Sequence, residues 1–313
     1  MRMILLFVAA FSLGAAAPPG GEAPPYHALT HEFARFYDHT VKMPEAARVA
    51  LFRKRFDRLF PGFYEPAPGQ SEAEFDRQVA RSLSGFAAIR PQYERVERDF
   101  PAAYARAMAH FRTFFPGFRP TLPVWFIHSL GRMDGGARTM RGKTYMIFGA
   151  DVIARIHSDG TIGPFLDHEL FHVENSRWFK DCVPETTVWC ALWQEGGATY
   201  AASQMNPGAD DHALMLDQPK PIRAAVDADW RTALCTTKRD FDAATRKAYA
   251  NYFFAGSGGR FPARWGYYVG YRLMQRIGKA HSLGEIDHMD HRAARAALTS
   301  ALDAAIAEAG GCA

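Results

Sequence analysis

The chain has 313 residues, 48% of them hydrophobic and 22% charged, and a formal net charge of +4 at pH 7. This composition excludes an intrinsically disordered chain, and the length allows one large or two modest domains. Lys and Arg are scattered among Asp and Glu, so the charge pattern does not favour nucleic acid as a partner.

The N-terminus has the layout of a secretory signal peptide. Arg2 precedes an apolar run at 4–13, and small residues follow it. We predict a signal peptide over 1–17, cut after Ala17 or after Gly14, and then a flexible segment over 18–25. The alternative is a buried N-terminal helix. The signal predicts an exported protein, periplasmic or secreted, with no membrane span once the signal is removed.

The segment 26–119 reads as a run of helices. Apolar residues recur at helical spacing in 43–60, 71–83 and 100–115. Ser71 and Glu74 form a capping box at the start of the second of these helices. We predict an N-terminal helical segment over 26–119.

The segment 120–313 begins with a different pattern. β-Branched and aromatic residues in 122–130 and 143–156 predict strands around a Gly-rich loop. Helical patterns follow from residue 164 onward. The fold class is therefore α+β, mostly α, with a small sheet before the first of these helices. The later helices are expected at 164–179, 186–204, 240–254, 265–278 and 290–311.

The sequence His168-Glu169-Leu170-Phe171-His172 is an HExxH motif inside the first of these helices. A helix places residues four apart on one face, so His168 and His172 can present imidazoles to one metal ion. A catalytic zinc usually has three protein ligands, and Glu195 in the next apolar helix is the candidate for the third. A lone carboxylate there would be costly without a partner. The alternative is a solvated carboxylate on the helix surface.

Glu169 and three tyrosines are the candidate catalytic groups. Glu169, next to a ligand, can act as general base toward water activated by zinc. An anionic intermediate needs a hydrogen-bond donor opposite the metal. Tyr267 and Tyr271 lie on one face of a predicted helix and are the candidates, with Tyr268 beside them. The alternative is that they are core aromatics.

The motifs "HELFH", "EGGATYAA" and "GYYVGY", preceded by the strand-like "TYMIFGADVI", resemble a bacterial family of predicted zinc-dependent proteases. The motif order is similar to that of gluzincin peptidases, and the resemblance covers about residues 120–280. It implies a gluzincin-like core over 120–313, with His168, His172 and Glu195 binding zinc and Glu169 as general base. It also implies that the preceding strand pairs with an extended peptide substrate. Thermolysin-like members have Asp four residues after the ligand Glu, whereas this chain has Thr199, so the groups around the ligands must differ.

These observations predict an exported zinc metallopeptidase with one zinc ion per chain and a peptide or protein substrate. The alternative is a zinc-containing binding or scaffold protein of the same fold that lacks turnover. A helical partner-binding protein with a chance HExxH is a third reading. The sequence does not predict an oligomeric state.

Four cysteines and several polar groups complete the candidates. In an oxidising compartment the cysteines favour disulfides, with three possible pairings, and free thiols are the alternative. His128 could touch substrate or lie satisfied in the sheet, and Glu174 is interpreted as structural. A second metal site in "HSLGEIDHMDH" is less favoured than a solvated polar segment. The four cysteines are Cys182, Cys190, Cys235 and Cys312. The candidate second metal site consists of His281, Asp287, His288, Asp290 and His291.

Overall fold

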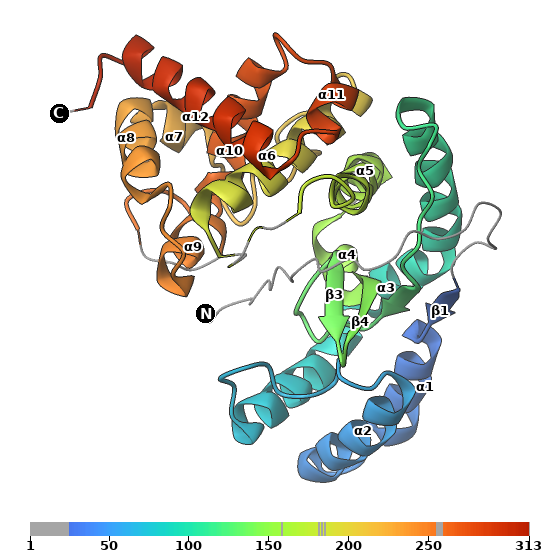
Figure 1. Cartoon of the computed structure of the whole chain (residues 1–313). Coiled ribbons are helices and arrows are strands. Elements are labelled where there is room, and N and C mark those ends of the chain that lie inside the picture. The colour runs from blue at the N-terminus through green and yellow to red at the C-terminus, as the bar shows by residue number, and fades with distance from the viewer. Residues whose placement is uncertain are drawn as a thin grey trace.

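The computed structural model describes residues 25–157, 159–180, 182, 184, 186–254 and 259–312. The fold is mostly helical with one small sheet (Figure 1), which confirms the predicted α+β, mostly α class. The predicted signal peptide lies outside the described residues. Within the described ranges, no helix combines the length and the apolar character needed to cross a membrane.

The N-terminal part consists of one short strand and three helices. They are β1 (Tyr26–Ala28), α1 (Thr30–Thr40), α2 (Glu45–Leu59) and α3 (Glu72–Phe114).

Helix α3 is a single helix of 43 residues, where we had predicted separate helices at 71–83 and 100–115. The predicted capping box of Ser71 and Glu74 is present at its start. Pro91 and Pro101 lie within it. A proline inside a helix removes one hydrogen bond and can kink it, but buried side chains on both sides of each proline hold this helix against the core.

The sheet has four strands in the order β1-β2-β4-β3. Strands β1, β2 (Val124–Ile127) and β4 (Lys143–Gly149) are parallel, and β3 (Ala137–Met140) pairs antiparallel with β4 as an edge strand. The predicted Gly-rich loop therefore contains a strand.

The predicted strand 143–156 ends at Gly149, and helix α4 (Ala150–Ile156) follows it. Asp151 in the first turn of α4 accepts hydrogen bonds from the backbone N–H groups of Ser129 and Gly131. This arrangement ties the start of α4 to the end of β2 and explains why the chain turns there.

Eight further helices of the described residues follow α4. A helix is present within the predicted range 240–254, but it runs only from Arg246 to Phe253, and a separate helix ends at Asp240. The first helix begins at Asp159, five residues before Pro164. The eight helices are α5 (Asp159–Asn175), α6 (Val188–Met205), α7 (Arg223–Asp227), α8 (Trp230–Asp240), α9 (Arg246–Phe253), α10 (Trp265–Ile277), α11 (Leu283–Asp287) and α12 (His291–Glu308).

Helix α6 is buried on nearly all sides, as expected for a helix that is apolar around its whole circumference. Figure 1 shows α5 between the sheet and the group of helices that contains α6, α10 and α12. Helices α6 and α10 approach closely at two glycines. A Cβ on Gly196 would lie 2.5 Å from Gly270 Cα, and one on Gly270 would lie 2.9 Å from Gly196 Cα. The two backbones are therefore in direct contact beside Glu195.

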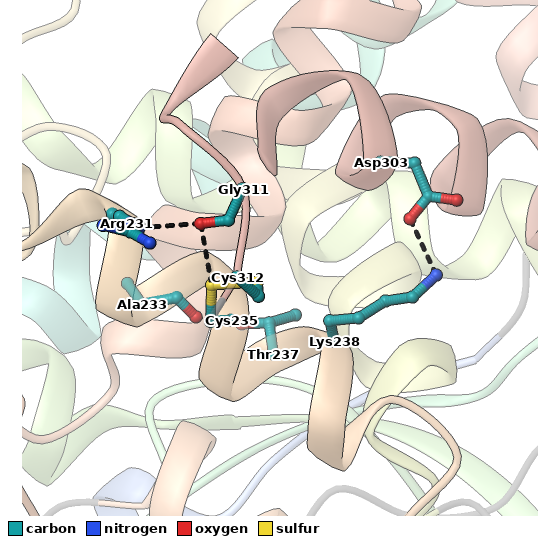
Figure 2. Close-up of a disulfide and its surroundings, with 8 residues drawn as sticks. All are labelled: Arg231, Ala233, Cys235, Thr237, Lys238, Asp303, Gly311 and Cys312. Atoms are coloured by element: carbon teal, nitrogen blue, oxygen red, sulfur yellow. Dashed lines mark hydrogen bonds and ion pairs between the residues drawn. A yellow bond between two sulfur atoms is a disulfide. The ribbon is translucent and has the colours of Figure 1, made fainter. Parts of the chain in front are cut away.

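Two disulfides join the four cysteines. Cys182–Cys190 joins a residue between α5 and α6 to the first turn of α6, and Cys235–Cys312 ties α8 to the C-terminal segment (Figure 2). At the second bridge, Arg231 Nε also donates to the carbonyl oxygen of Gly311 at 2.7 Å. The structure thus selects one of the three possible pairings.

Candidate metal centre

Helices α5 and α6 bring the three predicted ligands together. His168 and His172, one turn apart on α5, have their Nε2 atoms 3.0 Å apart. Each Nε2 atom lies 3.4 Å from Oε2 of Glu195 on α6. All three ligand atoms thus converge on one point in a pocket that Glu169, Tyr267 and Arg264 also line.

These separations fit a tetrahedral zinc ion. Ligand atoms about 2.0–2.2 Å from a tetrahedral zinc lie about 3.3–3.6 Å from one another. The measured 3.0, 3.4 and 3.4 Å are close to this range. Two imidazoles and one carboxylate are also a donor set that catalytic zinc uses, with the fourth position free for water. The residues present therefore fit the metal.

The electrostatics of the three groups are strongly coupled. Glu195 is only 4% exposed, and burial alone would raise its pKa, but the imidazoles of His172 and His168 hold the pKa well below its usual range. Burial lowers the pKa of His168. A zinc ion binds a carboxylate in its charged form, and Glu195 stays charged beside the two imidazoles although it is buried.

Glu169 is covered by the backbone that leads into β3. A Cβ on Gly135 would lie 2.7 Å from Phe165 Cζ and 3.1 Å from Glu169 Cγ, and one on Gly136 would lie 3.7 Å from Glu169 Oε2. Gly136 also has a φ of +133°, which favours glycine. Only glycines allow the chain to pass this close to the glutamate.

Burial raises the pKa of Glu169 to about 8, while the nearby His172 opposes the shift. A bound dication would lower this value, because it favours the carboxylate. Glu169 is therefore a group whose proton affinity depends on what occupies the pocket.

A comparison with protein families gives a match. The model described as "Predicted Zn-dependent protease (DUF2268)" matches residues 132–296, just over half of the 313 residues. The chain belongs to this family. No curated protein and no solved structure matches the chain.

The family match includes all the predicted site residues, from His168 to Tyr271. Tyr267 lines the pocket, and its ring stacks toward His168 with the centroids 6.4 Å apart. Burial raises the pKa of Tyr267, so the phenol keeps its proton. Tyr271 is buried but does not line this pocket, and the hydroxyl of Tyr268 binds Asp227. Tyr267 therefore lies in the pocket and Tyr271 outside it, and the catalytic role of each stays a prediction.

The position four residues after Glu195 has a local role. Thr199 Oγ1 donates to the backbone oxygen of Glu195 at 2.8 Å. Asp167, the residue before the ligand His168, makes two contacts with other elements. Its Oδ2 lies 3.0 Å from His110 Nδ1 of α3 and accepts a hydrogen bond from Asn206 Nδ2 at 2.8 Å. These contacts fix α5 against α3 and the end of α6.

Sequence reasoning missed three charged groups of the pocket, Asp134, Arg138 and Arg264. Asp134 Oδ2 lies 3.3 Å from His157 Nε2, and Asp134 Oδ1 accepts from the N–H of Gly135. The consecutive glycines after Asp134 were a usable signal, because glycine in or beside a strand often marks close backbone approach. For Arg264, which comes to the pocket from the start of α10, the sequence contains no local signal.

The other sequence candidates lie outside the pocket. His128 is buried and stacks on Phe33 with ring centroids 3.5 Å apart. Glu174 binds Arg177, as expected for a structural residue. In "HSLGEIDHMDH", Asp287 is fully buried, so the expectation of a solvated segment is wrong at that position.

Among the described residues, the second group with metal-ligand spacing is Cys182, Cys190 and His291. Its two sulfurs form a disulfide, so neither is available as a thiolate ligand.

Proposed function

We propose that this chain is an exported zinc-dependent metallopeptidase with one zinc ion per chain and a gluzincin-like core. The observation that carries the proposal is the convergence of His168, His172 and Glu195 in a pocket where Glu169 also lies. Membership of a family described as predicted Zn-dependent proteases supports it. A purely structural ion would have no use for Glu169.

Zinc bound by these residues would supply a Lewis acid and lower the pKa of water toward neutrality. The protein supplies the rest. The carboxylate of Glu169 takes up a proton from water and returns it to the leaving amine. Because Gly135 and Gly136 cover Glu169, bulk water is kept from one side of the carboxylate. The Tyr267 hydroxyl keeps its proton and donates a hydrogen bond to the oxyanion that develops on the substrate carbonyl.

We propose that the substrate backbone lies along β3. This strand is at the edge of the sheet, and its first residues, Ala137 and Arg138, line the pocket. An extended peptide can add to such an edge as a further strand through main-chain hydrogen bonds. This placement would bring a peptide bond to the metal from the side of Glu169.

Export is supported by the two disulfides, because such bonds persist in oxidising compartments. The N-terminal pattern of Arg2 and an apolar run supplies the matching signal. A periplasmic or secreted location is therefore part of the proposal.

The proposal is tested with three single variants of the mature protein. Glu169→Gln should keep the parent's zinc content and lose about a hundredfold or more of peptide hydrolysis, since general base catalysis contributes about 10²–10⁴. Glu195→Ala should lose zinc. Glu174→Gln is the matched control, because Glu174 lies on α5 like Glu169 but outside the pocket. It should keep both zinc and activity.

Zinc content is measured by elemental analysis, and hydrolysis with a fluorescently labelled unfolded protein and a mixture of quenched peptides. A Glu169→Gln variant with full activity would refute the mechanism. A folded parent that binds zinc but cleaves none of these substrates would favour the scaffold alternative.

A further inference from the structure

Two arginines line the metal pocket without a close ion pair among the described residues. Among the described residues, many surface guanidiniums pair with a carboxylate, for example Arg90 with Asp38 and Arg223 with Asp211. Arg138 and Arg264 line the pocket, and no carboxylate of the described residues lies within 4.0 Å of either guanidinium. The carboxylates of Glu169, Glu195 and Asp134 act on Arg138 only from beyond 4.0 Å. A partly buried charge without a directly bonded partner is costly.

The contacts of Arg264 leave part of its guanidinium unused. Its Nη1 reaches the backbone oxygen of Met215 only at 3.4 Å, and its buried Nε has no hydrogen-bond partner. The guanidinium lies over the ring of Tyr267, 4.3 Å from the centroid. The guanidinium is thus held beside a pocket residue but lacks a full set of acceptors.

The backbone of Arg264 is also constrained. Its φ is 66°, in the left-handed region that few residues other than glycine adopt. Met215, the residue whose carbonyl it approaches, has a φ of 58° and lines the same pocket. Such conformations cluster at ligand sites, where the surrounding structure maintains them.

Arg138 enters the pocket from the edge strand. Its Nη1 donates to the backbone oxygen of Ala137 at 2.9 Å. A Cβ on Gly136 would lie 3.5 Å from this Nη1 and 3.7 Å from Oε2 of Glu169, so the guanidinium and the proposed general base both flank this glycine. This position is on the path proposed for the substrate backbone.

The pocket carboxylates are already engaged. Asp134 contacts His157, and Glu195 contacts both ligand histidines. With Glu169, three carboxylates and two guanidiniums line the pocket, which gives one excess negative formal charge. A zinc ion would leave one excess positive charge, which one substrate carboxylate would neutralise.

We propose that Arg138 and Arg264 form a binding site for a carboxylate of the substrate next to the scissile bond. The inference rests on the proposed function, and it defines the substrate class as peptides that carry a carboxylate at this point. That carboxylate is either the free C-terminus or an acidic side chain. Arginine suits this role because its planar guanidinium donates two parallel hydrogen bonds to a carboxylate.

The test compares binding and turnover of four forms of one fluorescent peptide. Two forms differ only in a C-terminal acid or amide, and two differ only in Glu or Gln next to the scissile bond. Binding is measured by anisotropy on zinc-loaded Glu169→Gln, which separates recognition from hydrolysis. Hydrolysis is measured on the parent.

The expected result is about tenfold or greater preference for at least one carboxylate form, since a hydrogen bond to a charged group contributes that much. Preference for the acid identifies the C-terminus as the source, and preference for Glu identifies a side chain. Arg138→Met and Arg264→Met should each reduce the preference through affinity and KM. Both should leave zinc content nearly unchanged and should weaken binding of the neutral form less than binding of the charged form.

Arg276→Met is the matched control, because Arg276 lies on α10, pairs with Glu308 and does not line the metal pocket. It should keep the full preference. Equal binding of charged and neutral forms, or no binding of any form, by a zinc-loaded protein would overturn this inference while leaving the zinc peptidase proposal standing. Loss of zinc binding in the parent would instead overturn the proposed function.

Discussion

Substitution of Gly196 by alanine should damage the metal site without touching a ligand. A Cβ at this position would lie 2.5 Å from Gly270 Cα, whereas carbon atoms pack best at about 3.5–4.0 Å. Helices α6 and α10 would have to separate by about 1 Å to accept it. Glu195 directly precedes Gly196 on α6, so the shift would move its carboxylate away from His168 and His172.

The substitution has two opposing effects on the free energy of unfolding, whereas its effect on zinc affinity has one direction. Overpacking costs about 1–3 kcal/mol, and replacing glycine by alanine inside a helix returns about 1 kcal/mol. The net loss in the free energy of unfolding is therefore about 0–2 kcal/mol. Zinc ligands tolerate displacements of only about 0.2 Å, so we expect zinc affinity to fall by about tenfold to a hundredfold.

The neighbouring glycine is the matched control. A Cβ on Gly197 would lie 3.5 Å from Phe171 Cε1, which is ordinary van der Waals contact. Gly197→Ala should therefore keep zinc affinity and gain up to about 1 kcal/mol in stability. The assay is a zinc titration against a chelator of known affinity, with thermal unfolding of the metal-free proteins alongside. Equal zinc affinity in the two variants would refute the role assigned to the contact between α6 and α10.

Three further predictions concern stability. Burial, with the neighbouring Glu174 carboxylate, raises the pKa of Asp287 from 3.8 to about 7. Because the folded state holds this proton more tightly than the unfolded state, stability should fall as pH rises from about 4 to about 7, by up to about 4 kcal/mol. Asp287→Asn should remove most of this fall in thermal unfolding at pH 5 and pH 8, whereas Asn at the exposed Asp303 should not; a parent-like pH profile in the first variant would count against the shift. Replacing Cys235 and Cys312 by serine opens a crosslink over 77 residues and should cost about 4 kcal/mol in denaturant unfolding; no loss of stability would contradict the entropic account. Ser71→Ala removes the capping box of α3 and should cost about 1 kcal/mol in the same assay, and an unchanged midpoint would show that tertiary packing alone fixes that helix end.

Local patterns in the sequence predicted the ligand geometry, because His168 and His172 are related by one turn of a helix whatever the rest of the chain does. Glu195 was identified by an energetic argument, since a carboxylate in an apolar helix needs a partner. The positions of these three side chains agree with the prediction, and their role as zinc ligands stays a proposal. Arg138 and Arg264 were missed because they reach the pocket from distant segments. Periodic patterns in the sequence predict local structure and not contacts between distant segments.

The errors in secondary structure have similar causes. The apolar, β-branched run through 143–156 reads as one strand, but Asp151 anchors a helix from within it by binding backbone N–H groups of another segment. Helix α3 continues through Pro91 and Pro101 because its buried face packs on the core, whereas local propensity alone predicts interruptions. In both cases tertiary contacts outweigh the local preference.

The contacts of α3 have a consequence for how this protein could be dissected. The matched family region begins at residue 132, yet His110 and Phe115 of the preceding segment contact Asp167 and Phe171 of the helix that carries both histidines. A fragment that starts at the homology boundary would leave that face of the helix open to solvent. The portion of the chain that the family model matches is thus smaller than the portion needed to support the site, and a fragment for laboratory work should retain α3.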